Sequence, residues 1–218
     1  NVHNTFIIPN GLPLDKFKKE NKTYNIKKKI LFFGRIHEKK GLELLFKAIN
    51  YLPASYFDKY QFEITGPGKH QTIQKIKKLI NENSLNGKVN YNEPIYDDEK
   101  INYLKKHDVF ILPSYEEGDS IALKEALGSY MPVIISKQCR LEIVEKYNAG
   151  IVIDTNVESL VSALLALQNF DLKQMGKNAR KLIEEKYDNN HCSSRLKKVY
   201  LDLYNGVSKS PDWVFDEK

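Results

Sequence analysis

The sequence predicts an α/β fold, a doubly wound parallel sheet of about six strands with helices on both faces and a helical C-terminal end. Three observations predict it. From residue 30 onward, short apolar runs alternate with longer amphipathic stretches, the pattern of strands that alternate with helices around a parallel sheet. The apolar runs are rich in Ile, Val, Leu and Phe, as in strands buried on both faces. After residue 155 the strand pattern stops and only helical segments follow.

Six segments match the pattern of a buried strand. They are residues 30–33, 62–65, 89–91, 109–112, 133–135 and 150–153. Each is short and rich in Ile, Val, Leu or Phe, so we expect each strand to be buried on both faces. We therefore expect them to form a single sheet.

The stretches between these strands have helical spacing. Apolar residues at Leu42, Leu45, Phe46 and Ile49 follow the period of an amphipathic helix. The expected helices lie near 41–51, 71–84, 98–106, 120–129 and 140–147, followed by 156–168, 171–186 and 191–204.

The two ends of the chain carry separate expectations. A polar tail with Pro211 and Trp213 ends the chain. Two alternatives are open for this tail: it frays, or it crosses to a partner domain in a longer protein and is anchored there by Trp213 and Phe215. The chain begins at Asn1 and enters the apolar run of residues 6–9 almost at once. We therefore expect a fragment with a portion upstream.

Residues 1–218 are predicted to form one domain, because 41% apolar residues can build a continuous core.

Composition narrows the class of function. The net charge of +6 favours a nucleotide, a phosphate-bearing substrate or an acidic lipid surface. The basic residues form short scattered clusters without interleaved aromatics, which disfavours a nucleic-acid partner. Cys139 and Cys192 have no metal-ligand spacing and are expected to be free thiols in a reducing cytosol. No apolar run approaches the ~20 residues that cross a bilayer, so we expect a soluble cytoplasmic protein.

The loops that follow the strands are the candidate ligand site, because parallel sheets bind ligands at the carboxyl ends of their strands. Gly34-Arg35 follows the first strand, and Lys40-Gly41 stands at the next helix start. Arg35, Lys40 and unpaired helix amides would together hold a diphosphate. The alternative is that Lys40 is a solvated surface lysine.

Two further loops give weaker signals. Gly66-Pro67-Gly68 allows a backbone to approach a ligand closely, although a plain tight turn explains Gly66 and Gly68 equally well. Residues 92–95, which include Pro94 and Ile95, offer backbone groups and an apolar surface to a nucleobase. An ordinary connection from strand to helix is the alternative for that loop.

The loop at residues 113–128 places two carboxylates around a helix start. Glu117 is expected in the loop and Glu125 about one and a half turns into the helix, so that both point into one cleft. Carboxylates accept hydrogen bonds from sugar hydroxyls, and helix-terminal amides bind a diphosphate. The amides between the two carboxylates belong to Gly118, Asp119, Ser120 and Ile121. The alternative, that the acids and Ser120 only cap the helix, leaves Glu125 unexplained.

Together these segments resemble the group 1, or family 4, retaining glycosyltransferases, in the C-terminal of their two Rossmann-like domains. The resemblance covers residues 7 to about 190, and the paired glutamates with seven residues between them are its most specific part. The segments that match in order are Pro9-Asn10-Gly11 with Phe17, Phe33-Gly34-Arg35, Lys40-Gly41, Gly66-Pro67-Gly68, residues 108–114, Glu117 with Glu125, and Gly128 with Pro132-Val133-Ile134.

The resemblance implies a role for each matching residue. Arg35 and Lys40 would bind the donor diphosphate, Glu117 the hydroxyls of the transferred sugar and Glu125 the ribose. The amides of Asp119, Ser120 and Ile121 would complete the cradle, and the base would lie near Pro94 and Ile95.

The resemblance also implies the reaction of the whole protein. A hexosyltransferase of this family transfers sugar from a UDP- or GDP-sugar to a glycan or glycolipid acceptor, needs no obligatory metal, and often works at the inner face of the membrane. The acceptor domain, normally N-terminal, is absent from this chain, so the isolated domain would be inactive. Asp119-Ser120 stands where many members have Phe-Gly, which adds a negative charge near the sugar. A non-catalytic nucleotide- or sugar-binding module and a phosphorylase-like relative are the alternatives.

Overall fold

The fold is built on one sheet of six parallel strands, as the computed structural model of the chain shows for residues 8–17 and 22–206. All six strands predicted from the sequence are present, and the fold class is confirmed. Their bounds are β1 Lys28–Phe33, β2 Tyr60–Thr65, β3 Val89–Asn92, β4 Val109–Leu112, β5 Val133–Ser136 and β6 Gly150–Ile153.

The strand order in the sheet is β3-β2-β1-β4-β5-β6. β1 pairs with β2 from Lys28↔Tyr60 to Phe33↔Thr65, and on its other side with β4 at Ile30↔Val109 and Leu31↔Phe110. The chain therefore leaves β1 toward one edge of the sheet and leaves β4 toward the other. The order reverses between β1 and β4, and such a switch point opens a crevice at the carboxyl ends of the strands.

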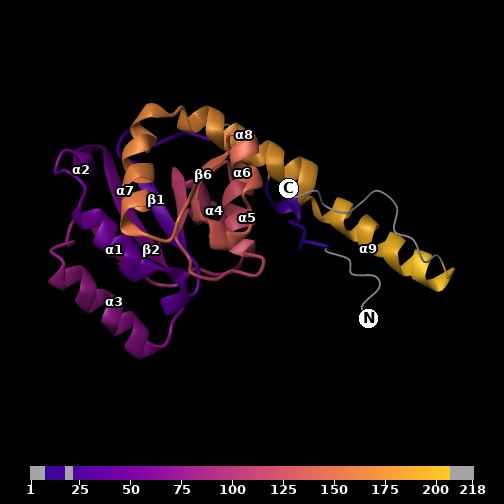
Figure 1. Cartoon of the computed structure of the whole chain (residues 1–218), viewed down its shortest axis with the longest axis horizontal. Coiled ribbons are helices and arrows are strands. Elements are labelled where there is room, and N and C mark those ends of the chain that lie inside the picture. The colour runs from indigo at the N-terminus through magenta and orange to yellow at the C-terminus, as the bar shows by residue number, and fades with distance from the viewer. Residues whose placement is uncertain (1–7, 18–21, 207–218) are drawn as a thin grey trace.

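Helices cover both faces of the sheet (Figure 1). On one side α1 contacts α3 and α7, and on the other α5 contacts α4 and α8. The bounds are α1 Leu42–Asn50, α2 Tyr56–Lys59, α3 His70–Glu82, α4 Asp97–Lys105, α5 Ile121–Gly128, α6 Ile143–Lys146, α7 Val157–Ala166, α8 Leu172–Lys186 and α9 Asn189–Tyr204.

Two helices differ from the sequence prediction. α2 is a single turn before β2 that was not predicted. α6 begins at Ile143 rather than near 140, because the preceding turn ends at Arg140 in a left-handed conformation with φ 53°. A right-handed helix cannot run through such a residue.

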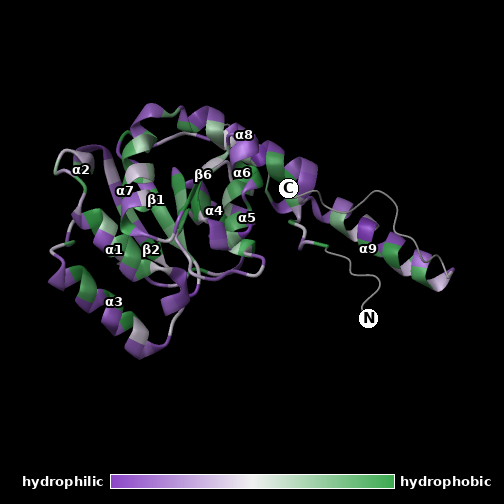
Figure 2. Ribbon diagram, viewed as in Figure 1, coloured by the Kyte–Doolittle hydropathy of each residue, from purple (hydrophilic) through white to green (hydrophobic). Residues whose placement is uncertain are grey.

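The core lies between the sheet and its helices. The strand residues Ile30, Phe62, Phe110, Ile111 and Ile134 are all fully buried, and hydrophobic residues gather at the strands in Figure 2. β1, β2, β4 and β5 are buried on both faces, as predicted. The same prediction was wrong for β3 and β6, where Asn90 is exposed and residues 150–152 are half-buried, because these two strands are the edges of the sheet.

The start of the described chain lies beside the junction between α8 and α9. The Leu12 amide donates to the Tyr187 carbonyl at 2.7 Å, and the Asn189 amide donates to the Leu12 carbonyl at 3.0 Å. From this junction α9 projects away from the sheet (Figure 1), with Tyr200 and Tyr204 exposed. The anchors expected at Trp213 and Phe215 lie outside the described residues. None of the helices in the described part of the chain combines the length and apolar character that a bilayer crossing requires.

Candidate functional site

The centre of the candidate site is an ion pair at the switch point of the sheet. The Nζ atom of Lys40, which follows β1, lies 2.6 Å from Oε1 of Glu117, which follows β4. The Ser114 hydroxyl donates to the same carboxylate oxygen at 2.6 Å. Only 6% of the Glu117 side chain and 18% of the Lys40 side chain are exposed. Lys40 is therefore not the solvated surface lysine of the alternative interpretation.

Backbone contacts hold the two loops of this pair together. The Tyr115 amide donates to the Lys39 carbonyl at 2.7 Å. Gly41 has φ 72°, and a Cβ atom there would lie 2.0 Å from the Pro113 carbonyl oxygen. Only glycine fits this close approach, so the glycine that follows Lys40 is required by the packing of the two loops.

Glu125, the second predicted carboxylate, also pairs with a cation. It lies on α5 and is 8% exposed, and its Oε1 atom lies 2.5 Å from Nζ of Lys100 on α4. Lys100 was not among the residues predicted for the site. Nothing local marks it, because the two residues are brought together only where α4 packs against α5.

The start of α5 is fixed by two residues with different partners. Ser120 is the N-cap and accepts a hydrogen bond from the Leu123 amide at 3.4 Å, as the capping alternative expected. Asp119 instead accepts from the Asn10 amide at 2.8 Å and forms an ion pair with Lys124. Lys124 is 2% exposed and also donates to the Asn10 carbonyl at 2.8 Å. The negative charge expected of Asp119 is thus matched by a buried lysine that the sequence analysis missed.

A hollow of about 230 Å³ opens beside this helix start. Gly118, Asp119 and Ser120 line it together with residues that follow β5, among them Cys139 and Arg140. Burial raises the pKa of the Cys139 thiol to about 11, so the thiol stays protonated at neutral pH and is a poor nucleophile. The hollow is also lined by Lys124 and Tyr187.

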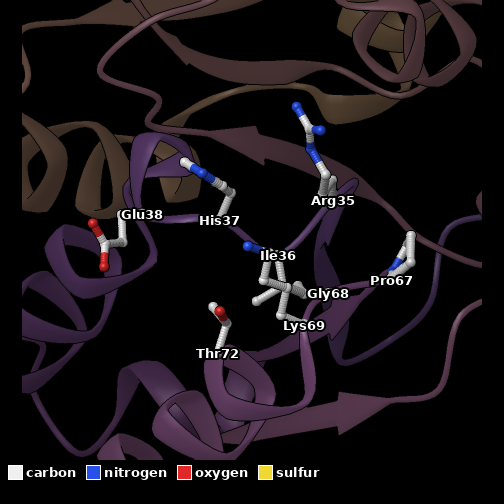
Figure 3. A pocket seen from close by; sticks show the side chains of 8 residues that line it. All are labelled: Arg35, Ile36, His37, Glu38, Pro67, Gly68, Lys69 and Thr72. Atoms are coloured by element: carbon white, nitrogen blue, oxygen red, sulfur yellow. The ribbon is translucent and has the colours of Figure 1, made fainter.

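A second hollow of about 640 Å³ lies between the loops after β1 and β2. Figure 3 shows Arg35 at its margin, with the guanidinium directed away from Thr72. Arg35 is exposed, and within the described residues no hydrogen bond or ion pair holds its side chain. Gly68 borders the same hollow.

The glycines of these two loops serve to pack them against each other. The Gly34 amide donates to the Thr65 carbonyl at 3.1 Å. A Cβ atom on Gly66 would lie 1.8 Å from the Gly34 carbonyl oxygen, and one on Gly68 would lie 2.9 Å from Cβ of Ile36. The packing of the two loops thus leaves no room for a side chain at Gly66 and little at Gly68.

The predicted residues all lie at the same edge of the sheet, but they do not all touch. Lys40 and Glu117 are in contact, whereas Arg35 borders one hollow and residues 118–120 border the other. Ile121 is the first residue of α5 and is exposed. Pro94 and Ile95 are half-buried in the loop between β3 and α4. In the described part of the chain, no group of three or more His, Cys, Asp and Glu side chains is arranged to hold a metal ion.

The comparison with known proteins decides the family. The sequence model described as glycosyl transferases group 1 matches residues 14–182. The chain belongs to this family of glycosyltransferases. The match contains Arg35, Lys40, Glu117 and Glu125, so the group 1 resemblance predicted from the sequence is confirmed.

Individual group 1 relatives and similar structures agree with this assignment. The chain is 27% identical over 222 residues to the UDP-Gal:alpha-D-GlcNAc-diphosphoundecaprenol alpha-1,3-galactosyltransferase of Escherichia coli. This alignment covers 90% of this chain and 54% of that protein. The C-terminal domain of a group 1 glycosyltransferase from Francisella tularensis superimposes with a TM-score of 0.69 at 18% identity, over 82% of this chain and 99% of that one. The Anabaena protein HepE, solved in complex with UDP and glucose, gives a TM-score of 0.74 at 16% identity, over 88% and 55%.

The chain spans about half the length of the curated relatives that it matches. The Francisella domain, which is a C-terminal domain by itself, is covered almost completely. The glycosyltransferase fold found here is thus that of a C-terminal domain.

Proposed function

We propose that this chain is the donor-binding domain of a retaining glycosyltransferase, which takes a hexose from a UDP- or GDP-sugar. The observation that carries the proposal is the Lys40–Glu117 pair, largely buried at the switch point between β1 and β4. Ligands of doubly wound folds bind at that point of the sheet. The pair offers a cation for a diphosphate next to a carboxylate for sugar hydroxyls.

The leaving group needs positive charge. Departure of a nucleoside diphosphate from the sugar leaves negative charge on its phosphates, and fixed cations and amides stabilise that charge. Lys40 is held in place by Glu117, while Arg35, which has no partner among residues 8–17 and 22–206, can swing toward the phosphates. The amides at the start of α5, from Gly118 to Ile121, would supply further donors.

The nucleoside would lie on the other side of the diphosphate. Glu125 would accept hydrogen bonds from ribose hydroxyls, and the loop of Pro94 and Ile95 would face the base. No protein carboxylate of this domain is needed as an acid or a base. We predict that sugar transfer by the whole enzyme does not require a metal ion.

Two similar proteins support the choice of donor. The Escherichia coli relative is named for a UDP-galactose donor and a lipid-linked acceptor, and the Anabaena protein binds UDP and glucose. By analogy we propose that an upstream acceptor domain supplies a site for a glycan or glycolipid. Three further points stay predictions: that the protein is cytoplasmic, that it works at the inner face of the membrane, and that the isolated domain is inactive.

Titration calorimetry with UDP, GDP and ADP tests donor binding directly. We expect UDP or GDP to bind wild-type protein more tightly than ADP does, and Lys40→Ala to weaken that binding. Absence of binding to both UDP and GDP would contradict the proposal.

A second experiment separates an enzyme from a binding module. The chain joined to its upstream sequence should transfer sugar from a nucleotide donor. Nucleotide binding without any transfer would instead favour a regulatory module, and a requirement for inorganic phosphate would favour a phosphorylase.

A further inference from the structure

Lys100 on α4 reaches the candidate ribose carboxylate from a neighbouring helix. We propose that it is a further residue of the donor site, which orients Glu125 toward the ribose and helps the site to distinguish ribonucleotides from their 2′-deoxy forms. The proposal rests on the proposed function, because it takes the ligand to be a nucleoside diphosphate.

The geometry of the pair leaves a defined acceptor free. Lys100 Nζ lies 2.5 Å from Oε1 of Glu125, and 10% of the Glu125 side chain is exposed. No other side chain of the described residues pairs with this carboxylate. Oε2 is therefore available to a ligand, while the bond to Oε1 limits rotation of the carboxylate. An ammonium group has three donors, so Lys100 keeps two after it binds Glu125.

The position of Lys100 along the chain links the pair to the candidate base loop. α4 begins at Asp97, two residues after Ile95, and Lys100 lies in its first turn. One short segment thus carries both the loop proposed for the base and the cation at the proposed ribose carboxylate. The nucleoside would be recognised by this segment together with α5.

The burial of Glu125 distinguishes this pair from ordinary surface pairs. Lys39 and Glu116 also form an ion pair, but their side chains are 57% and 66% exposed, and exposed pairs have little energetic effect. Burying a charged group costs free energy unless the group is paired. Lys100 supplies that partner without closing access to the second oxygen.

The test compares the affinities for UDP and 2′-deoxy-UDP by calorimetry. Wild-type protein should prefer UDP by about tenfold or more, as expected for loss of one hydrogen bond to a charged group. Glu125→Gln and Lys100→Met should both reduce this preference to about twofold or less, because the first removes the charge of the acceptor and the second removes the cation that orients it. Lys100→Arg should retain most of the preference, and Lys39→Met, in the exposed pair, should leave it unchanged. If GDP is the nucleotide that binds, GDP and 2′-deoxy-GDP replace the uridine pair.

Four outcomes overturn the inference, and they are distinguishable. If Lys100→Met keeps the full preference while Glu125→Gln loses it, Lys100 is a bystander. If Lys100→Met weakens the binding of both nucleotides equally and lowers the melting temperature of the protein, the role of Lys100 is only structural. If wild-type protein binds both forms equally, Glu125 does not contact the 2′-hydroxyl, although donor binding stands. If wild-type protein binds no nucleotide, the proposed function fails as well.

Discussion

The ammonium group of Lys40 and the carboxylate of Glu117 lie 2.6 Å apart, although 77 residues separate them in the sequence. The strand order places them together, because β1 and β4 are neighbours in the sheet. The pair fixes one cation beside the place where a donor diphosphate would bind. A mostly buried cation that is already oriented loses little freedom on binding.

Lys40→Ala should therefore weaken UDP binding by about tenfold to a hundredfold, since a charge-assisted hydrogen bond contributes about 1.5 to 3 kcal/mol. Uridine binding should change by less than about twofold, because uridine has no phosphates. Calorimetry with both ligands checks this, with Lys39→Ala as the matched control one residue away. An equal loss for UDP and uridine would argue that Lys40 acts on the fold rather than on the phosphates.

Arg35→Ala should leave the stability of the fold unchanged, because the exposed Arg35 side chain has no partner among the described residues. If Arg35 closes on the diphosphate, UDP affinity should fall by about tenfold. His37 borders the same hollow, and His37→Ala is the control for a general change there. If Arg35→Ala binds UDP as tightly as wild-type protein does, Arg35 does not contact the diphosphate.

The sequence predicted the sheet better than it predicted the partners of the site residues. Strands at the centre of a parallel sheet leave a local signature, an apolar run such as Val109–Leu112. All six strands were found, although the edge strands β3 and β6 are only partly buried. The pairing of Glu125 with Lys100 and of Asp119 with Lys124 depends on where helices and loops meet, and no such signature exists for it. Gly66 shows the same limit, because its requirement comes from the carbonyl of Gly34 in another loop.

Gly66→Ala should destabilise the protein, because the added Cβ would lie 1.8 Å from the Gly34 carbonyl oxygen and Gly66 has φ 154°. A loss of about 1 to 3 kcal/mol in the free energy of unfolding is expected for overpacking. Gly118→Ala is the matched comparison, since nothing lies within 4 Å of its added Cβ. Urea unfolding of both variants checks the difference. Equal stability of the two variants would show that the loops after β1 and β2 can separate at little cost.

Lys124→Met should destabilise the fold through the start of α5. Lys124 is 2% exposed and bonds both Asp119 and the Asn10 carbonyl, so its loss leaves polar groups without partners. Such losses cost about 1 to 3 kcal/mol. Lys181→Met, which breaks an exposed pair with Glu185, should change the unfolding free energy by less than about 0.5 kcal/mol. If the two variants unfold alike, the link between Asn10 and α5 does not contribute to stability.

Glu63→Gln should change how stability depends on pH. The His107 ring Nε2 donates to Oε2 of Glu63 at 3.0 Å, the Tyr103 hydroxyl donates at 3.1 Å and Lys29 lies 3.2 Å from Oε1. The hydrogen bond from His107 is the main cause that lowers the pKa of Glu63 to about 2, against the opposing effect of burial.

A carboxylate with a lowered pKa in the folded state stabilises the fold at pH values above its unfolded pKa, and that stabilisation is lost as pH falls toward the folded pKa. Wild-type protein should therefore be more stable than Glu63→Gln at pH 6, and the difference should shrink between about pH 5 and pH 2. Urea unfolding across this range checks it. A difference that stays constant with pH would mean that Glu63 acts through its shape and hydrogen bonds rather than through its charge. The hydrogen bonds of Glu63 include one from Asn92 at the end of β3. The candidate base loop that follows Asn92 would then be held without any contribution from the charge of Glu63.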